Sequence, residues 1–203
     1  MLLHDFELSG NCYKVRLFLN LLQLPHDILA VDLVNGAHKQ PSFLELNPKG
    51  QVPVLQDGGW RIADSQAILV YLAKKYAPVE WYPQDPETAG EIQFWLATAA
   101  NEIARGPADA RLVKLFRAKI DYEAAASKAH AVLTVLEQHL KERLFLVGSR
   151  VTIADLAVFP YVALAGDGDI DLGGYPAIDT WIERIKALSG FIGMPGITAP
   201  ATA

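Results

Sequence analysis

The sequence contains very little cysteine: Cys12 is the single one among 203 residues. One cysteine cannot form an intramolecular disulfide, and it excludes a metal site built from several thiolates. The five histidines show no H-E-x-x-H or comparable ligand spacing, so we expect no bound metal. So little cysteine fits a reducing compartment, and we expect a cytoplasmic protein.

The chain also lacks long apolar runs and an excess of positive charge. No stretch approaches the roughly eighteen apolar residues of a membrane helix, and the N-terminus has no secretion-signal pattern. A formal net charge of −5 argues against nucleic acid and anionic membranes as partners. With 51% apolar and 20% charged residues, the composition is instead typical of a folded globular protein.

The first 77 residues alternate between strand and helix patterns. Short apolar or alternating runs predict strands, and apolar residues three and four positions apart predict helices. Asp57-Gly58-Gly59 lies between two such runs and predicts a hairpin. The predicted order is β-α-β-α-β-β-α, a mixed sheet with helices on its faces in the thioredoxin-like arrangement. We expect strands near residues 2–6, 28–33, 54–55 and 60–62, and helices near 15–22, 41–44 and 67–75.

The second half shows only helical patterns. Three prolines between residues 78 and 86 predict a stiff linker over 78–85, followed by an all-helical domain over 86–203. Gly106-Pro107 is expected to break the first helix, near 88–104. Asp121 is expected to cap the next, and Thr152-Ile153-Ala154-Asp155 forms a capping box for a third, near 156–164. A last helix is expected near 176–188, and the tail from Gly190 to be loosely held.

Ser9-Gly10-Asn11-Cys12 lies between the first strand and the first helix. Ser9 or Asn11 is suited to cap the helix by accepting hydrogen bonds from its free N–H groups. The same position suits an anion, because a helix start carries partial positive charge. A hydroxyl there can donate to a thiolate and lower the pKa of the thiol. Cys12 is a rival nucleophile, but it lacks a partner cysteine and precedes an apolar run, which favours a structural thiol.

A proline interrupts a strand pattern in Gly50-Gln51-Val52-Pro53-Val54-Leu55. Proline has no N–H and restricts the residue before it, so this strand edge is expected to serve another purpose. With a cis Val52–Pro53 bond, the N–H and C=O of Val52 would point outward and pair with an extended peptide. Gln51 offers an amide to the same peptide.

Asp64 and Ser65 follow one hairpin later, at the start of a predicted helix. Both are typical helix caps, yet a carboxylate, a hydroxyl and free N–H groups can also hold the charged amino end of a peptide. His38-Lys39 is either a solvated turn or a cationic pair for a second carboxylate. Together these segments indicate a docking site for a small peptide that carries both positive and negative charges.

With these segments, the chain resembles a glutathione transferase over nearly its whole length. The resemblance covers the thioredoxin-like first part, the proline linker and the helical second part, and it is strongest to the phi, theta and bacterial branches. The box at Thr152–Asp155 is similar to the family's buried folding motif. The segments that look like the family's glutathione site are residues 35–39, 46–55 and 64–68.

The resemblance implies a set of glutathione-binding residues. Val52 would pair with the cysteinyl backbone, Asp64 and Ser65 would hold the γ-glutamyl end, and His38 and Lys39 would face the glycyl carboxylate. Asp64 stands where many members have glutamate. The implied binding residues are His38, Lys39, Gln51, Val52, Pro53, Asp64 and Ser65.

Two residues are implied to be catalytic. Ser9 would be the thiol-activating hydroxyl. Asn11 stands where the serine branches often have proline, so it could share or take over the contact with the sulfur. No cysteine occupies position 9 or 10, which argues against the cysteine-dependent thioltransferase branches.

Three functions follow from the resemblance. The first is conjugation, in which the glutathione thiolate attacks a small apolar electrophile near the loop after the first strand and residues 101–116. The second is glutathione-dependent disulfide or peroxide reduction on the same site, as in some bacterial relatives with threonine or asparagine in this loop. The third is a non-catalytic glutathione-binding or regulatory scaffold, which has no physical need for the proline motif, Asp64-Ser65 and Ser9 together.

The resemblance also implies partners. Glutathione would be a cosubstrate, with no metal, no nucleic acid and no membrane involved. A two-fold homodimer is expected, with Asn101, Glu102 and Arg105 reaching toward the partner's glutathione.

Overall fold

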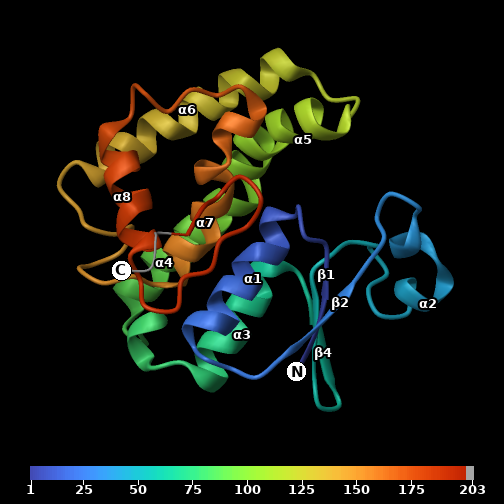
Figure 1. Ribbon diagram of the computed structural model, residues 1–203. Coiled ribbons are helices and arrows are strands. Elements are labelled where there is room, and N and C mark those ends of the chain that lie inside the picture. Colours follow the sequence, from blue (N-terminus) through green and yellow to red (C-terminus); the bar gives the residue numbers. More distant parts are fainter. Residues whose placement is uncertain (200–203) are drawn as a thin grey trace.

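A four-stranded mixed sheet forms the centre of the first half in the computed structural model, which describes residues 1–199 (Figure 1). Its strands are β1 (Leu2–Asp5), β2 (Asp27–Ala30), β3 (Val54–Asp57) and β4 (Trp60–Ala63). They lie in the order β2-β1-β3-β4, with β1 and β2 parallel and the other pairs antiparallel. The predicted hairpin is confirmed, with Asp57 opposite Trp60. Strand β2 ends three residues earlier than predicted.

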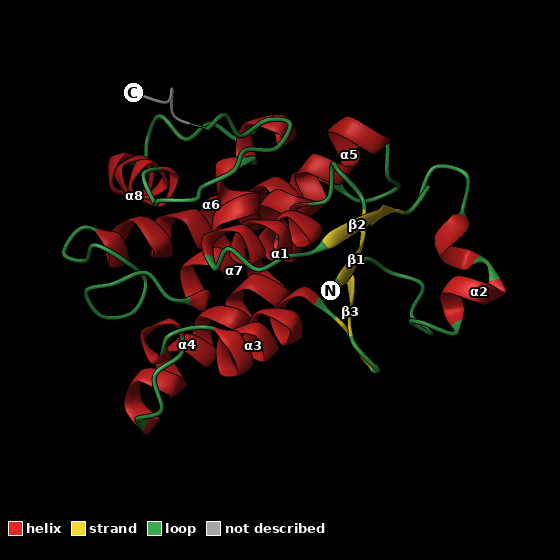
Figure 2. Cartoon of the chain, turned by 60° about the horizontal axis from the view of Figure 1, so that its bottom comes forward, coloured by secondary structure: helices red, strands yellow, loops and turns green. Residues whose placement is uncertain are grey.

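Helices cover both faces of this sheet. Figures 1 and 2 both show α1 (Gly10–Leu21) and α3 (Ser65–Tyr76) on one side, and α2 (Pro41–Leu44) on the other. A 3-10 turn, η1 (Ala37–Lys39), precedes α2. The thioredoxin-like order is confirmed, and α1 begins five positions earlier than predicted, because Ser9 caps it.

Within the described residues, the elements of the second half are all helical. Two 3-10 turns, η2 (Val79–Trp81) and η4 (Ala165–Gly168), accompany them. No helix within residues 1–199 is both long and apolar enough to span a bilayer. The larger elements are α4 (Pro86–Thr98), the π-helical η3 (Ala99–Ala108), α5 (Asp109–Phe116), α6 (Tyr122–Leu140), α7 (Ile153–Ala163) and α8 (Pro176–Lys186).

The predicted helix break at Gly106-Pro107 is wrong. The helix continues through η3 directly into α5. A Cβ added at Gly106 would lie 2.8 Å from the backbone nitrogen of Ala129, so this glycine lets η3 approach α6 closely. The wider π-helical turns accommodate Pro107, which has no N–H to donate. The expected cap on α6 is confirmed, since Asp121 accepts the N–H of Ala124.

Helix α7 lies at the middle of the molecule and packs against α1, α3 and α4. The predicted capping box is confirmed: Thr152 and Asp155 exchange side-chain and backbone hydrogen bonds at the start of α7. The Asp155 carboxylate, fully buried, also accepts the N–H of Leu146 and the indole N–H of Trp181, each at 2.9 Å. One cluster of buried apolar side chains runs from Leu3 in β1 to Ile197, so both halves of the chain share a core.

The segment after α8 is packed, contrary to the expectation of a loose tail. Asn20 donates to the carbonyl of Gly190, and the hydroxyl of Tyr13 donates to that of Ile192, both at 2.6 Å. Met194 and Ile197 form a small bridge and are 8% and 4% exposed. These contacts attach residues 190–197 to α1; the rest of the expected tail, 200–203, lies outside the described residues.

Candidate active site

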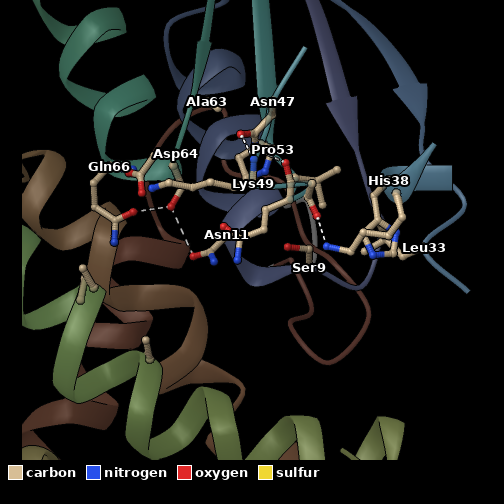
Figure 3. A pocket seen from close by; sticks show the side chains of 18 residues that line it. Ser9, Asn11, Leu33, His38, Asn47, Lys49, Pro53, Ala63, Asp64 and Gln66 are labelled. Carbon is tan, nitrogen blue, oxygen red and sulfur yellow. Dashed lines mark hydrogen bonds between the residues drawn. The ribbon is translucent and has the colours of Figure 1, made fainter. Parts of the chain in front are cut away.

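A pocket of about 640 Å³ lies between the sheet half and η3 (Figure 3). One wall comes from the β1–α1 loop, the loop before β3 and the start of α3, and the other from Ala99, Ala100 and Ala104. All the residues predicted for the site line this one pocket. They are Ser9, Asn11, His38, Lys39, Gln51, Val52, Pro53, Asp64 and Ser65.

Ser9 ends the loop after β1 and caps α1. Its Oγ accepts the backbone N–H of Cys12 at 3.2 Å. Because capping uses a lone pair of the oxygen, the hydroxyl hydrogen stays available to donate into the pocket. Capping of α1 and donation to an anion are therefore compatible roles for Ser9.

Cys12 is a structural thiol, as the sequence indicated. It is 0% exposed, and its Sγ accepts the N–H of Phe6. Burial raises the pKa of Cys12 to about 12, although the hydrogen bond with Ser9 opposes the shift. Since the thiolate is the reactive form, this cysteine is not a usable nucleophile at neutral pH.

Within residues 1–199, no three His, Cys, Asp or Glu side chains are grouped to hold a metal ion.

Asn11 connects the start of α1 to the start of α3. Its Oδ1 accepts hydrogen bonds from Ser65 Oγ at 3.3 Å and from Lys14 Nζ at 2.9 Å. Figure 3 shows Asn11 between Ser9 and the segment from Asp64 to Gln66. Lys14 was not predicted as a site residue, and its only signal in the sequence is a lysine next to an apolar run.

The loop before β3 presents a free piece of backbone. The Val52–Pro53 bond is cis, as expected. Among residues 1–199, neither the N–H nor the C=O of Val52 has a hydrogen-bonding partner. Asn47 is buried and belongs to the predicted segment 46–55, although it was not named as a site residue. It shapes the loop by donating to the carbonyl of Gln51 at 2.8 Å and accepting the N–H of Lys49 at 3.1 Å.

One end of the pocket is rich in nitrogen donors. Lys39 Nζ donates to the carbonyl of Gly50 at 3.0 Å, and Lys49, also within the predicted segment 46–55, lines the same end. Gly50 has φ +57°, and a Cβ there would lie 2.8 Å from the His38 carbonyl oxygen, so the position requires glycine. The Nδ1 of His38 is the one buried side-chain polar atom within residues 1–199 that lacks a partner. This end of the pocket is suited to a carboxylate.

Asp64 lies at the opposite end of the pocket, with a strained backbone. Its φ of 77° and ψ of 124° are rare for a residue other than glycine, and such strain is commonest at functional sites. Its Oδ1 alone caps α3, by accepting the N–H groups of Gln66 and Ala67 at 2.9 and 3.1 Å. Capping by one oxygen leaves the other carboxylate oxygen for a cation.

A second, smaller cavity of about 280 Å³ adjoins Ser9. It is mostly apolar and is built from the loop after β1, the loop after β2 and helices α5 and α7. Its buried arginine, Arg111, is paired with Asp167 at 2.9 Å, so the charge is compensated. The lining residues are Phe6, Leu8, Ser9, Leu33, Val34, Arg111, Leu112, Phe116 and Tyr161.

Tyr161 of α7 sits over the start of α1. A Cβ at Gly10 would lie 2.9 Å from Cε1 and Cζ of its ring, so only glycine allows this approach. Burial raises the pKa of Tyr161, and the Ser9 hydroxyl and the Asn11 N–H act on the phenol in the opposite direction. The phenol is therefore protonated at neutral pH and lies beside Ser9.

The fold and the site together define a thioredoxin-like protein with an added helical half and a polar pocket that has an acidic end and an end rich in nitrogen donors. Residues 3–80 match the family model "Glutathione S-transferase, N-terminal domain", and residues 89–188 match "Glutathione S-transferase, C-terminal domain". The chain belongs to the glutathione S-transferase family.

Individual relatives agree with this assignment. Glutathione S-transferase theta-1 of Bos taurus is 31% identical over 194 residues, covering 90% of this chain and 81% of the relative. A crystal structure of a glutathione S-transferase from Pseudomonas fluorescens has a TM-score of 0.90 at 31% identity, covering 95% and 98% of the two chains. A Drosophila mojavensis homologue, described with bound glutathione, has a TM-score of 0.84 at 27% identity, covering 92% and 87%.

Proposed function

We propose that the chain binds glutathione in the polar pocket and presents its thiolate, beside Ser9, to a small apolar electrophile. One observation carries this proposal: Ser9 lines both the polar pocket and the apolar cavity. A sulfur atom held by Ser9 would therefore face the cavity. Stabilising an anion and placing it beside its target are the two contributions that such a reaction needs from a protein.

The two ends of the pocket support a defined direction for glutathione. The glycyl carboxylate would lie near His38 and Lys39, where nitrogen donors gather. The cysteinyl backbone would pair with the free N–H and C=O of Val52. The γ-glutamyl end would place its ammonium on Asp64 and its carboxylate on Ser65 and the N–H groups of α3.

The reaction itself needs only the thiolate and its target. The hydroxyl of Ser9 donates to the sulfur, and the start of α1 carries partial positive charge. Both stabilise the negatively charged thiolate relative to the thiol. The thiol loses its proton to bulk solvent, the sulfur forms a bond to the electrophilic carbon, and the leaving group departs with its electron pair. Asn11 is positioned to supply a second donor.

Disulfide or peroxide reduction remains the second candidate, and the amide of Asn11 beside Ser9 favours it. Such a reaction would use the same polar pocket with two glutathione molecules or a mixed disulfide. A non-catalytic glutathione-binding scaffold is the third possibility.

Two assays separate these candidates. Retention on immobilised glutathione tests binding, and turnover of a chlorinated nitrobenzene against a hydroxyethyl disulfide tests the type of reaction. We expect retention and faster turnover of the nitrobenzene. Faster turnover of the disulfide would favour reduction, and retention without turnover of either would favour the scaffold. A protein that is not retained and turns over neither compound would refute the proposal.

We also propose a homodimer in the cytoplasm, where glutathione is abundant. Asn101, Glu102 and Arg105 line an apolar groove formed by α4, η3 and α6 rather than the polar pocket of their own chain. Phe94 and Val135, each 60% exposed, lie in the same groove. A second copy of the chain would cover them. Light scattering should give twice the chain mass for the native protein and the monomer mass for Phe94→Glu.

A further inference from the structure

Lys14 of α1 is completely buried, with 0% of its surface exposed. The ion pairs of the described residues do not include it. Its Nζ donates to Asn11 Oδ1 at 2.9 Å, the one acceptor it reaches in residues 1–199. A buried ammonium without a paired carboxylate is costly, because water no longer solvates it.

Few charged or titratable groups act on this amine. The ring of Tyr161 lies with its centroid 5.6 Å from Nζ, and Asp64 acts on it through space. Burial lowers the pKa of Lys14 to about 7, with Asp64 opposing the shift. An anion bound nearby would favour the charged amine, because opposite charges stabilise each other's ionised forms.

The amine also fixes the orientation of the Asn11 amide. The oxygen of this amide accepts from Lys14 Nζ at 2.9 Å, whereas the single hydroxyl hydrogen of Ser65 is shared between Asn11 Oδ1 at 3.3 Å and Gln66 Oε1 at 2.5 Å. The lysine ammonium can only donate and an amide nitrogen cannot accept, so the amide oxygen faces Lys14 and the NH₂ group faces the other way. Asn11 lines the polar pocket, and its N–H donors are thereby presented to a ligand there.

We infer that Lys14 is a positioning residue for the bound thiolate: it holds Asn11 with its N–H groups toward the sulfur and places a positive charge behind it. The inference rests on the proposed function, because the anion that compensates the buried charge is the glutathione thiolate. Lys14 itself does not touch the substrate.

The substitution Lys14→Met tests this, because methionine is similar in length and carries no charge. The pKa of the thiol of bound glutathione, measured from the ultraviolet absorbance of the thiolate, should rise by about one unit. Binding of glutathione should weaken, whereas binding of S-methylglutathione, which has no ionisable thiol, should change less than about twofold. Stability toward urea should be unchanged or higher, since a desolvated charge is removed. Lys74→Met, at an exposed lysine of α3, is the matched control.

A double-mutant cycle with Asn11→Ala isolates the path of the effect. If Lys14 acts through Asn11, the double variant should lose little beyond either single variant. Lys14→Gln, which keeps a donor without the charge, replaces the methionine variant if that one does not fold. Failure of both to fold would show a purely structural role and overturn the inference.

The other results are equally decisive. An unchanged thiol pKa in Lys14→Met, or an equal loss of affinity for both ligands, would overturn the role of Lys14 while leaving glutathione binding intact. If the native protein bound neither ligand, the proposed function itself would fail.

Discussion

The guanidinium of Arg111 donates a hydrogen bond of 2.8 Å to the carbonyl of Leu8, 103 positions earlier in the chain. Leu8 directly precedes Ser9, and Arg111 is itself held by Asp167 of η4 at 2.9 Å. The helical half of the molecule therefore fixes the loop that carries the proposed catalytic hydroxyl. This contact makes the position of Ser9 depend on α5 as well as on α1.

Substituting Arg111→Met should impair both stability and turnover. The carbonyl of Leu8 and the carboxylate of Asp167 would lose their partner, at a cost of about 2 kcal/mol in the free energy of unfolding. With the loop released, kcat/KM for the conjugation reaction should fall about tenfold. Arg184→Met is the control, because Arg184 also donates to a backbone carbonyl, that of Leu144, but far from the site. Equal effects of the two substitutions on turnover would contradict the prediction.

Ser9→Ala should separate the two roles of this hydroxyl. Loss of the cap on α1 should reduce the free energy of unfolding by about 1 kcal/mol. Loss of the donor should lower kcat/KM about a hundredfold and abolish the thiolate absorbance of bound glutathione at neutral pH. Asp121→Ala removes a comparable cap from α6 and should lower stability alone. An unchanged thiolate absorbance in Ser9→Ala would move the catalytic role to Asn11.

Asp64→Asn tests the proposed contact with the glutamyl ammonium. Asparagine keeps an oxygen for the cap on α3, so stability should change little. The lost charge should raise the KM for glutathione about tenfold, which corresponds to about 1.4 kcal/mol, with kcat nearly unchanged. A glutathione analogue without its α-amino group should show no difference between the two proteins. If Asp64→Asn also raised the KM for this analogue about tenfold, the proposed contact would be refuted.

Asp155 should give stability a measurable pH dependence. Burial raises the pKa of Asp155 from 3.8 to about 6, so between these pH values the native state binds its proton more tightly than the unfolded chain. Its contribution to stability is therefore largest below about pH 4 and falls, by about 3 kcal/mol, as pH rises through 6. Urea unfolding of the native protein and of Asp155→Asn at several pH values from 4 to 7 gives the free energy of unfolding of each. The difference between these two free energies should change with pH by the stated amount. A constant difference would contradict the shift.

Local signals predicted four of the polar side chains that cap helices, but not Asp85 at the start of α4. Ser9, Asp64, Asp121 and Thr152 all cap the helices at which the sequence indicated them. Each cap is a property of three or four consecutive residues, which is why the sequence is enough. The binding residues were predicted from the local chemistry of their loops and then from resemblance to a family, and the structure gathers them in one pocket.

Long-range packing explains what the sequence did not predict. Gly106 serves the contact between η3 and α6 and not a helix end. Helix α8 has no capping side chain of its own; Glu137 of α6 accepts the N–H groups of Ala177 and Ile178 instead. Lys14 and Arg111 are buried by elements distant in sequence, so composition and spacing could not separate them from surface cations.

The bonds from α1 to the carbonyls of Gly190 and Ile192 have a consequence for synthesis of the protein on the ribosome. The first helix emerges early, but the acceptors for Asn20 and Tyr13 lie 170 and 179 positions later in the chain. A nascent chain must therefore wait with part of that helix uncovered until residues 190–192 leave the exit tunnel. Polypeptides truncated even slightly before residue 190 should accordingly be captured by chaperones and degraded sooner than the full-length product.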